Sequence, residues 1–204
     1  MTKIDLKRAH RALFVPPPGR FAAVAVPTFG FVKVDGAGDP NTAAAYRAGV
    51  EWLYGVSYAM KFAAKCGLGR DDVVPPLEAL WWSEDPAAFV RREKDCWRWT
   101  VMIMAPDFVT PAIFADAIAK SAATRSDRPE TLRFEPYAEG RALQTLHVGP
   151  YDAEGPILQH LHAEVMPGLG LTFNGAHHEI DLSDPRRTEP AKLRTILRQP
   201  VRPV

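Results

Sequence analysis

The sequence predicts an α+β fold in which two pseudo-symmetric strand-helix-strand-strand modules form one antiparallel sheet with two long helices on one side. Two segments resemble each other: residues 80–86 and 180–185 both read as the end of a strand followed by Ser and an acidic-Pro turn. Each is preceded by a strand, a Gly-rich turn and a helix, and each is followed by a Thr-containing strand. This internal repeat indicates two copies of one structural unit. Such copies can pair edge to edge with both helices on the same face.

Length and composition are ordinary for a soluble globular protein. The 204 residues are 47% hydrophobic and 24% charged, with a formal net charge of +1. This length allows a sizeable core, and the charge gives no general attraction to nucleic acid or to anionic membranes. No apolar run approaches the roughly 20 residues of a membrane helix. The charged first eleven residues contain no signal-peptide core, and Cys66 and Cys96 lack a CxxC partner, so we expect a cytoplasmic protein. The oligomeric state stays open.

An N-terminal arm over residues 1–20 is expected to precede a domain over 21–204. The prolines at 16–18 must end any helix in the arm. The first module, about 21–125, begins with a strand over 21–34 that is irregular at Pro27. Asp39-Pro40 supplies a helix N-cap followed by the proline favoured at the first helical position. The elements expected after it are a helix over 40–66, strands over 72–83 and 97–104 joined by a charged loop over 84–95, and a helix from Thr110 to about 123.

The second module, about 126–204, is expected to repeat this order. The polar stretch 126–130 marks the boundary between the halves. The elements expected after it are strands over 132–137 and 141–148, a helix over 153–166, and strands over 177–182 and 192–201.

The first long helix carries an unusual number of aromatic residues. Tyr54, Tyr58 and Phe62 share one side at four-residue spacing, and Tyr46 lies two turns before Tyr54. One interpretation is an aromatic seam within the core. The other is a pocket wall, because a dry core would need hydrogen-bond partners for several phenol groups.

The last module places acidic side chains within a strand. Period-two alternation puts Glu179 and Asp181 on one face and Ile180 on the other. These carboxylates either face water, as most strand carboxylates do, or line a cavity. When the two repeats are superimposed, Glu78 falls one residue from Glu179, so we expect both to approach a central cleft.

Other patterns indicate neither a metal site nor a cofactor. His160 and His162 are two residues apart on a helix, whereas helical zinc motifs use a spacing of four. No phosphate-binding or dinucleotide-binding fingerprint is present. The basic C-terminal region around Arg186 and Arg187 is interpreted as a solvated face and not as a nucleic-acid site.

Taken together, these motifs resemble the GyrI-like small-molecule-binding family, in its stand-alone branch. The stretches that carry the resemblance are 35–41, 53–61, 76–82, 147–151 and 177–187. The resemblance implies two pseudo-symmetric modules around a central cavity that accepts flat, hydrophobic and often cationic molecules. It also implies that Glu179 occupies the place of the buried glutamate that faces the ligand in multidrug-binding relatives. This chain has Asp181 where related sequences usually carry an aromatic residue.

The expected function is therefore the binding of hydrophobic, planar or cationic small molecules in an aromatic pocket, in the service of detoxification. The expected ligand-binding residues are Tyr46, Tyr54, Glu78, Trp81, Trp82 and Tyr151. Adjacent strand residues face opposite ways, so the sequence does not decide between Trp81 and Trp82.

The alternative is a cyclopropanoid hydrolase, because the branch is linked to the opening of cyclopropane-bearing alkylating natural products. Glu179 would then activate water, and Tyr58 would stabilise the developing negative charge as the second catalytic residue. A third hypothesis, a protein partner bound at the sheet edge, has little support in the sequence.

Overall fold

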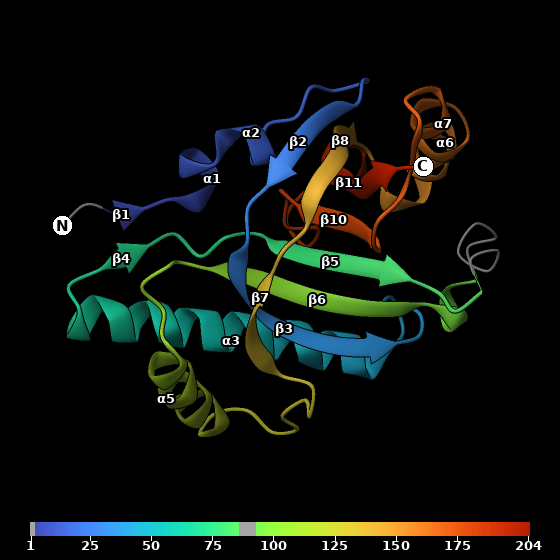
Figure 1. Ribbon diagram of the computed structural model, residues 1–204. Coiled ribbons are helices and arrows are strands. Elements are labelled where there is room, and N and C mark those ends of the chain that lie inside the picture. The colour runs from blue at the N-terminus through green and yellow to red at the C-terminus, as the bar shows by residue number, and fades with distance from the viewer. Residues whose placement is uncertain (1–2, 86–92) are drawn as a thin grey trace.

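The computed structural model describes residues 3–85 and 93–204, and it contains the predicted antiparallel sheet (Figure 1). Residues 1–2 of the expected arm and residues 86–92 of the expected charged loop lie outside the described residues. The strands of the main sheet, in spatial order, are β2 (Ala22–Val26), β8 (Gly140–Val148), β11 (Arg194–Pro203), β10 (His177–Asp181), β5 (Leu77–Trp82), β6 (Arg98–Ala105), β3 (Phe29–Ala37) and β7 (Arg133–Tyr137). A short strand, β9 (Leu171–Phe173), pairs with the end of β11.

The two halves of the chain pair their strands in the same way. The first half orders its strands β3-β6-β5 and the second β8-β11-β10, and the halves meet where Ala79 of β5 lies opposite Glu179 of β10. Each half also lends a strand to the other, because β2 pairs with β8 and β7 pairs with β3. The sheet therefore confirms the predicted fold class and is held together by strand exchange as well as by the central pair.

Two predicted strands are wrong in extent because of proline. The strand expected over 21–34 is broken at Pro27, and its two parts, β2 and β3, have different partners. The strand expected over 72–83 begins only at Leu77, after Pro75 and Pro76. A separate short strand, β4 (Asp71–Asp72), pairs with β1 (Lys3–Ile4) instead. Proline has no N–H to donate to a ladder, so the chain leaves one set of partners at these points and joins another.

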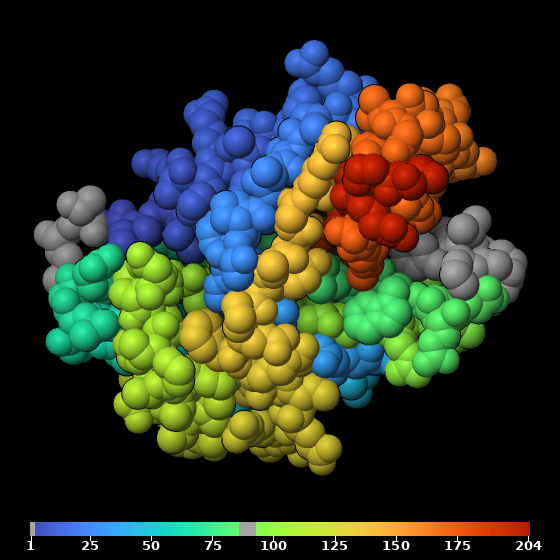
Figure 2. Space-filling view, in the orientation of Figure 1, coloured from blue at the N-terminus to red at the C-terminus, as the bar shows by residue number. Residues whose placement is uncertain are grey.

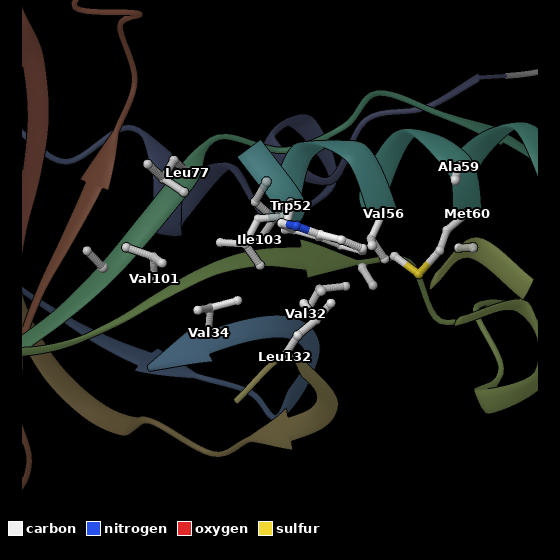
Figure 3. Close-up of a cluster of buried hydrophobic side chains, with 14 of the residues drawn as sticks. Val32, Val34, Trp52, Val56, Ala59, Met60, Leu77, Val101, Ile103 and Leu132 are labelled. Atoms are coloured by element: carbon white, nitrogen blue, oxygen red, sulfur yellow. The ribbon is translucent and has the colours of Figure 1, made fainter. Parts of the chain in front are cut away.

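The first long helix, α3 (Ala44–Gly67), covers one face of the first half of the sheet. Its buried side chains Trp52, Val56 and Met60 point towards the valines and isoleucine of β3 and β6 (Figure 3). The close packing requires Gly36 in β3, since a Cβ there would lie 2.2 Å from the ring of the fully buried Trp99. A second helix, α5 (Pro111–Ala122), packs beside α3, and Thr110 Oγ1 caps it by accepting the Ile113 N–H at 3.3 Å, as predicted.

The predicted start of α3 at Pro40 is wrong by four residues. Asp39 Oδ1 accepts the Asn41 N–H at 2.9 Å, and the Asp39 carbonyl oxygen accepts the Ala43 N–H at 2.8 Å. These bonds close a local turn, which is the usual alternative to helix capping for aspartate. The helix therefore begins only at Ala44.

The helix of the second half is shorter and irregular. It starts as a 3₁₀ turn over Tyr151–Ala153, continues as α6 (Gly155–His160), widens into a π-helical segment over Leu161–Val165 and ends as α7 (Met166–Gly168). Buried Leu161 and Met166 pack with Leu143 of β8 and Val201 of β11. This helix is thus anchored towards the outer part of its half-sheet, which leaves the central strands β5 and β10 uncovered by it.

The N-terminal arm covers the reverse face of the sheet. It contains α1 (Leu6–Ala9) and α2 (Arg11–Phe14), and Leu6, Leu13 and Phe14 belong to the same buried cluster as Leu80 and Ile180 of the central strands. Figure 2 shows the arm, in dark blue, on the side of the molecule that also displays β2 and β8. No helix in the described ranges combines the length and apolar character needed to cross a membrane.

Candidate functional site

A large cleft lies over the central strands, between the two helices. Its volume is about 1790 Å³, enough to hold a drug-sized molecule. The floor consists of Leu77, Ala79 and Trp81 from β5 together with Glu179 and Asp181 from β10. The walls include Tyr46, Tyr54 and Tyr58 from α3 on one side and Tyr151, Gln159 and His162 from the second helical segment on the other.

Strand alternation selects which side chains reach this floor. Because Ala79 lies opposite Glu179, the odd-numbered residues of both β5 and β10 share the cleft face. Trp81 therefore faces the cleft, whereas Trp82 packs in the reverse-face cluster beneath the arm. Glu78 also points to the reverse face. It precedes Ala79, the residue opposite Glu179, by one position, and neighbouring residues of a strand point to opposite faces of the sheet.

An aromatic cluster forms one end of the cleft. The rings of Tyr46 and Trp81 are stacked with centroids 6.0 Å apart, and Trp97 meets Trp81 edge to face at 5.7 Å. Trp81 is only 6% exposed, and its indole N–H has no hydrogen-bond partner among the described residues. Flat aromatic faces beside an unused N–H donor suit a planar ligand that carries a hydrogen-bond acceptor.

The acidic floor is partly enclosed by these walls. Glu179 Oε1 lies 3.5 Å from His177 Nε2, and the Tyr151 hydroxyl donates to Asp181 Oδ1 at 3.3 Å. Burial and the neighbouring Glu179 raise the pKa of Asp181 to about 7, although the bond from Tyr151 acts against this shift. Burial and then the charge of Asp181 raise the pKa values of Tyr46 and Tyr151 well above their usual range, so both stay protonated donors.

Glu78 belongs to a different assembly, a buried ionic network on the reverse face. His178 Nε2 lies 3.0 Å from Glu78 Oε2, and its Nδ1 lies 2.8 Å from Glu139 Oε1. Arg198 binds the other oxygen of Glu139 at 3.1 Å and donates to the carbonyl oxygen of Leu13 in the arm at 2.7 Å. This network ties the arm to the central strands and takes no part in the cleft.

The structure thus brings together six of the eight residues expected at the site. Those that line the cleft are Tyr46, Tyr54, Tyr58, Trp81, Tyr151 and Glu179. Glu78 and Trp82 do not reach it, for the register reason given above. Tyr58 is 47% exposed, so it is the most accessible of the α3 tyrosines.

Sequence reasoning missed several lining residues. Trp97 could have been recognised because it alternates with buried Trp99. Arg125 lies against α3 at Gly55, where a Cβ would come within 2.4 Å of the guanidinium carbon. A glycine inside a helix is a signal for such a close approach, but it does not identify the partner.

The histidines of the second helix do not form a metal site. His160 is exposed and its Nδ1 lies 3.3 Å from Glu164 Oε2, while His162 lines the cleft. Within residues 3–85 and 93–204, no three His, Cys, Asp or Glu side chains are placed to hold a metal ion.

Comparisons with known proteins agree with this architecture. The sequence profile of the GyrI-like small molecule binding domain family matches residues 34–202. An uncharacterized conserved protein from Listeria innocua shares 35% identity with a TM-score of 0.89, over 98% of this chain and 100% of that one. A protein from Listeria innocua described as a hydrolase shares 34% identity with a TM-score of 0.87, over the same shares of the two chains.

A more distant structure shares the fold alone. The C-terminal domain of EcmrR has 12% identity and a TM-score of 0.58, over 91% of this chain and 98% of that one. No curated protein sequence matches this chain.

Proposed function

This chain belongs to the GyrI-like small molecule binding domain family, and we propose that it binds planar, hydrophobic cations in the cleft between α3 and α6. The observation that carries the proposal is the combination of stacked aromatic rings with two carboxylates on one cleft floor. Retention of such molecules would lower their free concentration, which is the basis for a role in detoxification.

The aromatic cluster and the acids contribute differently to recognition. A cation over the face of Trp81 or Tyr46 gains roughly 0.5 to 2 kcal/mol, depending on how far it is desolvated. The contacts are flat, so they admit ligands of several outlines. Glu179 adds selection for positive charge. Its side chain is only 18% exposed, so little water solvates the carboxylate, and a bound cation would supply the favourable contact instead.

A titration with rhodamine 6G, followed by fluorescence anisotropy, tests this proposal. Glu179→Gln should weaken binding about tenfold or more, as expected for the loss of a charge-assisted contact. Trp81→Ala should weaken it by about 2- to 30-fold through loss of the ring face. Glu189→Gln is the matched control, because Glu189 is 72% exposed and pairs with Lys192 outside the cleft. Affinity that is the same in all three variants and the wild type would refute the assigned site.

A second candidate function is hydrolysis of an electrophilic cyclopropane conjugated to a carbonyl. It is favoured by the two acids next to Tyr151 and by the similarity to the Listeria innocua protein described as a hydrolase. Glu179 would take a proton from water while the water oxygen bonds to the strained ring carbon. The ring C–C bond would break, its electron pair would move through the conjugated system to the carbonyl oxygen, and that oxygen would gain a proton.

Mass spectrometry separates this reaction from binding alone. The wild type mixed with such a compound should convert it to a product heavier by one water, and Glu179→Gln should lose this conversion. A product that forms at the buffer rate with the wild type would remove the hydrolase function and leave the binding function standing.

A further inference from the structure

Two carboxylates share the cleft face of one short strand. Glu179 and Asp181 are separated by Ile180, which is fully buried on the reverse face. Their Cα atoms are therefore about 7 Å apart, at about 3.3 Å per residue. Both side chains lie on the floor of the same cleft, so they repel each other through a medium that contains less water than bulk solvent.

Basic residues also line the cleft, but in the part of the chain that the structure describes no ion pair joins any of them to Glu179 or Asp181. They are Lys7, Arg47, Lys94, Arg125, Arg186 and Arg187. Within the described residues, no lysine or arginine nitrogen lies within 4.0 Å of either carboxylate, and the nearby cation Arg186 is held by both oxygens of Asp184 at 3.0 Å. Other ionisable groups near the pair include His177 from β10, Tyr46 and Tyr54 from α3, and Tyr151, Glu154 and His162 from the second helical segment.

The pair has one ionisable neighbour on its own strand, since His177 Nε2 lies 3.5 Å from Glu179 Oε1, and among the residues that the structure describes no cation is paired with Asp181. The strands beside β10 contribute uncharged residues opposite the pair, with Ala79 and Leu197 opposite Glu179 and Thr195 opposite Asp181. Burial, followed by the proximity of His177, lowers the pKa of His162 to about 4, so His162 is neutral near pH 7. Two ionised carboxylates without a cation are unfavourable, and one of them gains a proton. Asp181 is the better place for this proton because burial and Glu179 raise its pKa to about 7.

We propose that Asp181, which lies beside Glu179 on the cleft floor, holds a proton in the ligand-free protein and releases it when an aromatic cation enters the cleft. This inference rests on the proposed binding function and defines its ligand class more narrowly, as molecules with a permanent positive charge. A neutral aromatic molecule of the same shape would not replace the proton, so it would bind with the proton still in place. The Tyr151 hydroxyl, which already donates to Asp181, stabilises the ionised form that the cation needs.

Proton release makes the affinity depend on pH in a defined direction. Below pH 7 the cation must displace the proton, and above pH 8 Asp181 is already ionised. Because the proton leaves a group that titrates near pH 7, the affinity for a monocation should rise about tenfold between pH 6 and pH 8 and should level off above pH 8. At pH 6.5, about 0.8 proton should be released for each cation bound.

Isothermal titration calorimetry of rhodamine 6G into the wild type tests this directly. Titrations at pH 6.5 in phosphate and in ACES, two buffers with different ionisation enthalpies, give the number of protons released. An uncharged aromatic dye such as Nile red should release none. Asp181→Asn should still bind rhodamine 6G but release no proton, and its affinity should not change between pH 6 and pH 8. The exposed Asp116 on α5 gives the matched control Asp116→Asn, which should behave as the wild type.

The outcomes separate the inference from the function on which it rests. Rhodamine 6G binding by the wild type with no proton release and no pH dependence would overturn the inference and leave the binding function intact. Release that persists in Asp181→Asn would show that the proton comes from another group and would also overturn it. Absence of rhodamine 6G binding by the wild type at every pH would refute the binding function. Should Asp181→Asn fail to fold, the wild-type comparison of charged and uncharged dyes decides the question alone.

Discussion

The buried network beneath the arm should make the stability of the protein fall as the solution becomes alkaline. His178 is 1% exposed and lies between Glu78 and Glu139. Burial alone would lower its pKa, but the charge of Glu139 and the hydrogen bonds to both carboxylates overcome this and raise the pKa to about 9. The folded protein therefore binds this proton more tightly than the unfolded chain does, where the histidine titrates near pH 6.5.

The size and sign of the effect follow from these two values. The protonated imidazole contributes roughly 3 kcal/mol to the free energy of unfolding below pH 6.5, and this contribution disappears as the pH rises through 9. Between pH 7.5 and pH 9 the loss should be about 1 to 2 kcal/mol. Asp181 loses its proton mostly below this window, and the tyrosines with raised pKa values lose theirs above it.

Urea denaturation at several pH values, followed by intrinsic fluorescence, measures this loss. Glu78→Gln should move the fall in stability to lower pH, because one of the two carboxyl groups that raise the pKa of His178 is then removed. His160→Gln is the matched control, since His160 is exposed and lies outside the network, and it should show the wild-type slope. Stability that stays constant between pH 7.5 and pH 9 in the wild type would refute the ion pairing of His178 described above.

Two other substitutions have defined consequences. Gly36→Ala should lower the free energy of unfolding by about 1 to 3 kcal/mol, because the new methyl group overlaps the ring of the fully buried Trp99. Thermal denaturation would show a lower Tm, and an unchanged Tm would contradict the close packing. Tyr151→Phe should remove the donor to Asp181, worth about 1 kcal/mol at this length, and so raise the pKa of Asp181 by about 0.7. The rise of rhodamine 6G affinity with pH should then move to higher pH by that amount, whereas a shift to lower pH would be inconsistent with the hydrogen bond.

Local patterns in the sequence predicted most of the elements and the fold class. Thr110-Pro111 starts a helix because hydroxyl capping and the fixed φ of proline act within four residues. The alternation around Ile180 put Glu179 and Asp181 on one face, and this too is a local effect, because successive side chains of a strand point to opposite faces. The repeat order indicated one antiparallel sheet, and the sheet order confirms it.

The composition of the cleft depended on contacts between distant segments. The pairing of Ala79 with Glu179 brings Trp81 into the cleft and turns Glu78 and Trp82 away, and no local pattern specifies that register. The bond between Tyr151 and Asp181 likewise joins residues 30 positions apart. The alternation of side chains between the two faces of a strand is local and can be predicted from the sequence. Which face becomes a cleft is decided only when helices from both halves pack on the sheet.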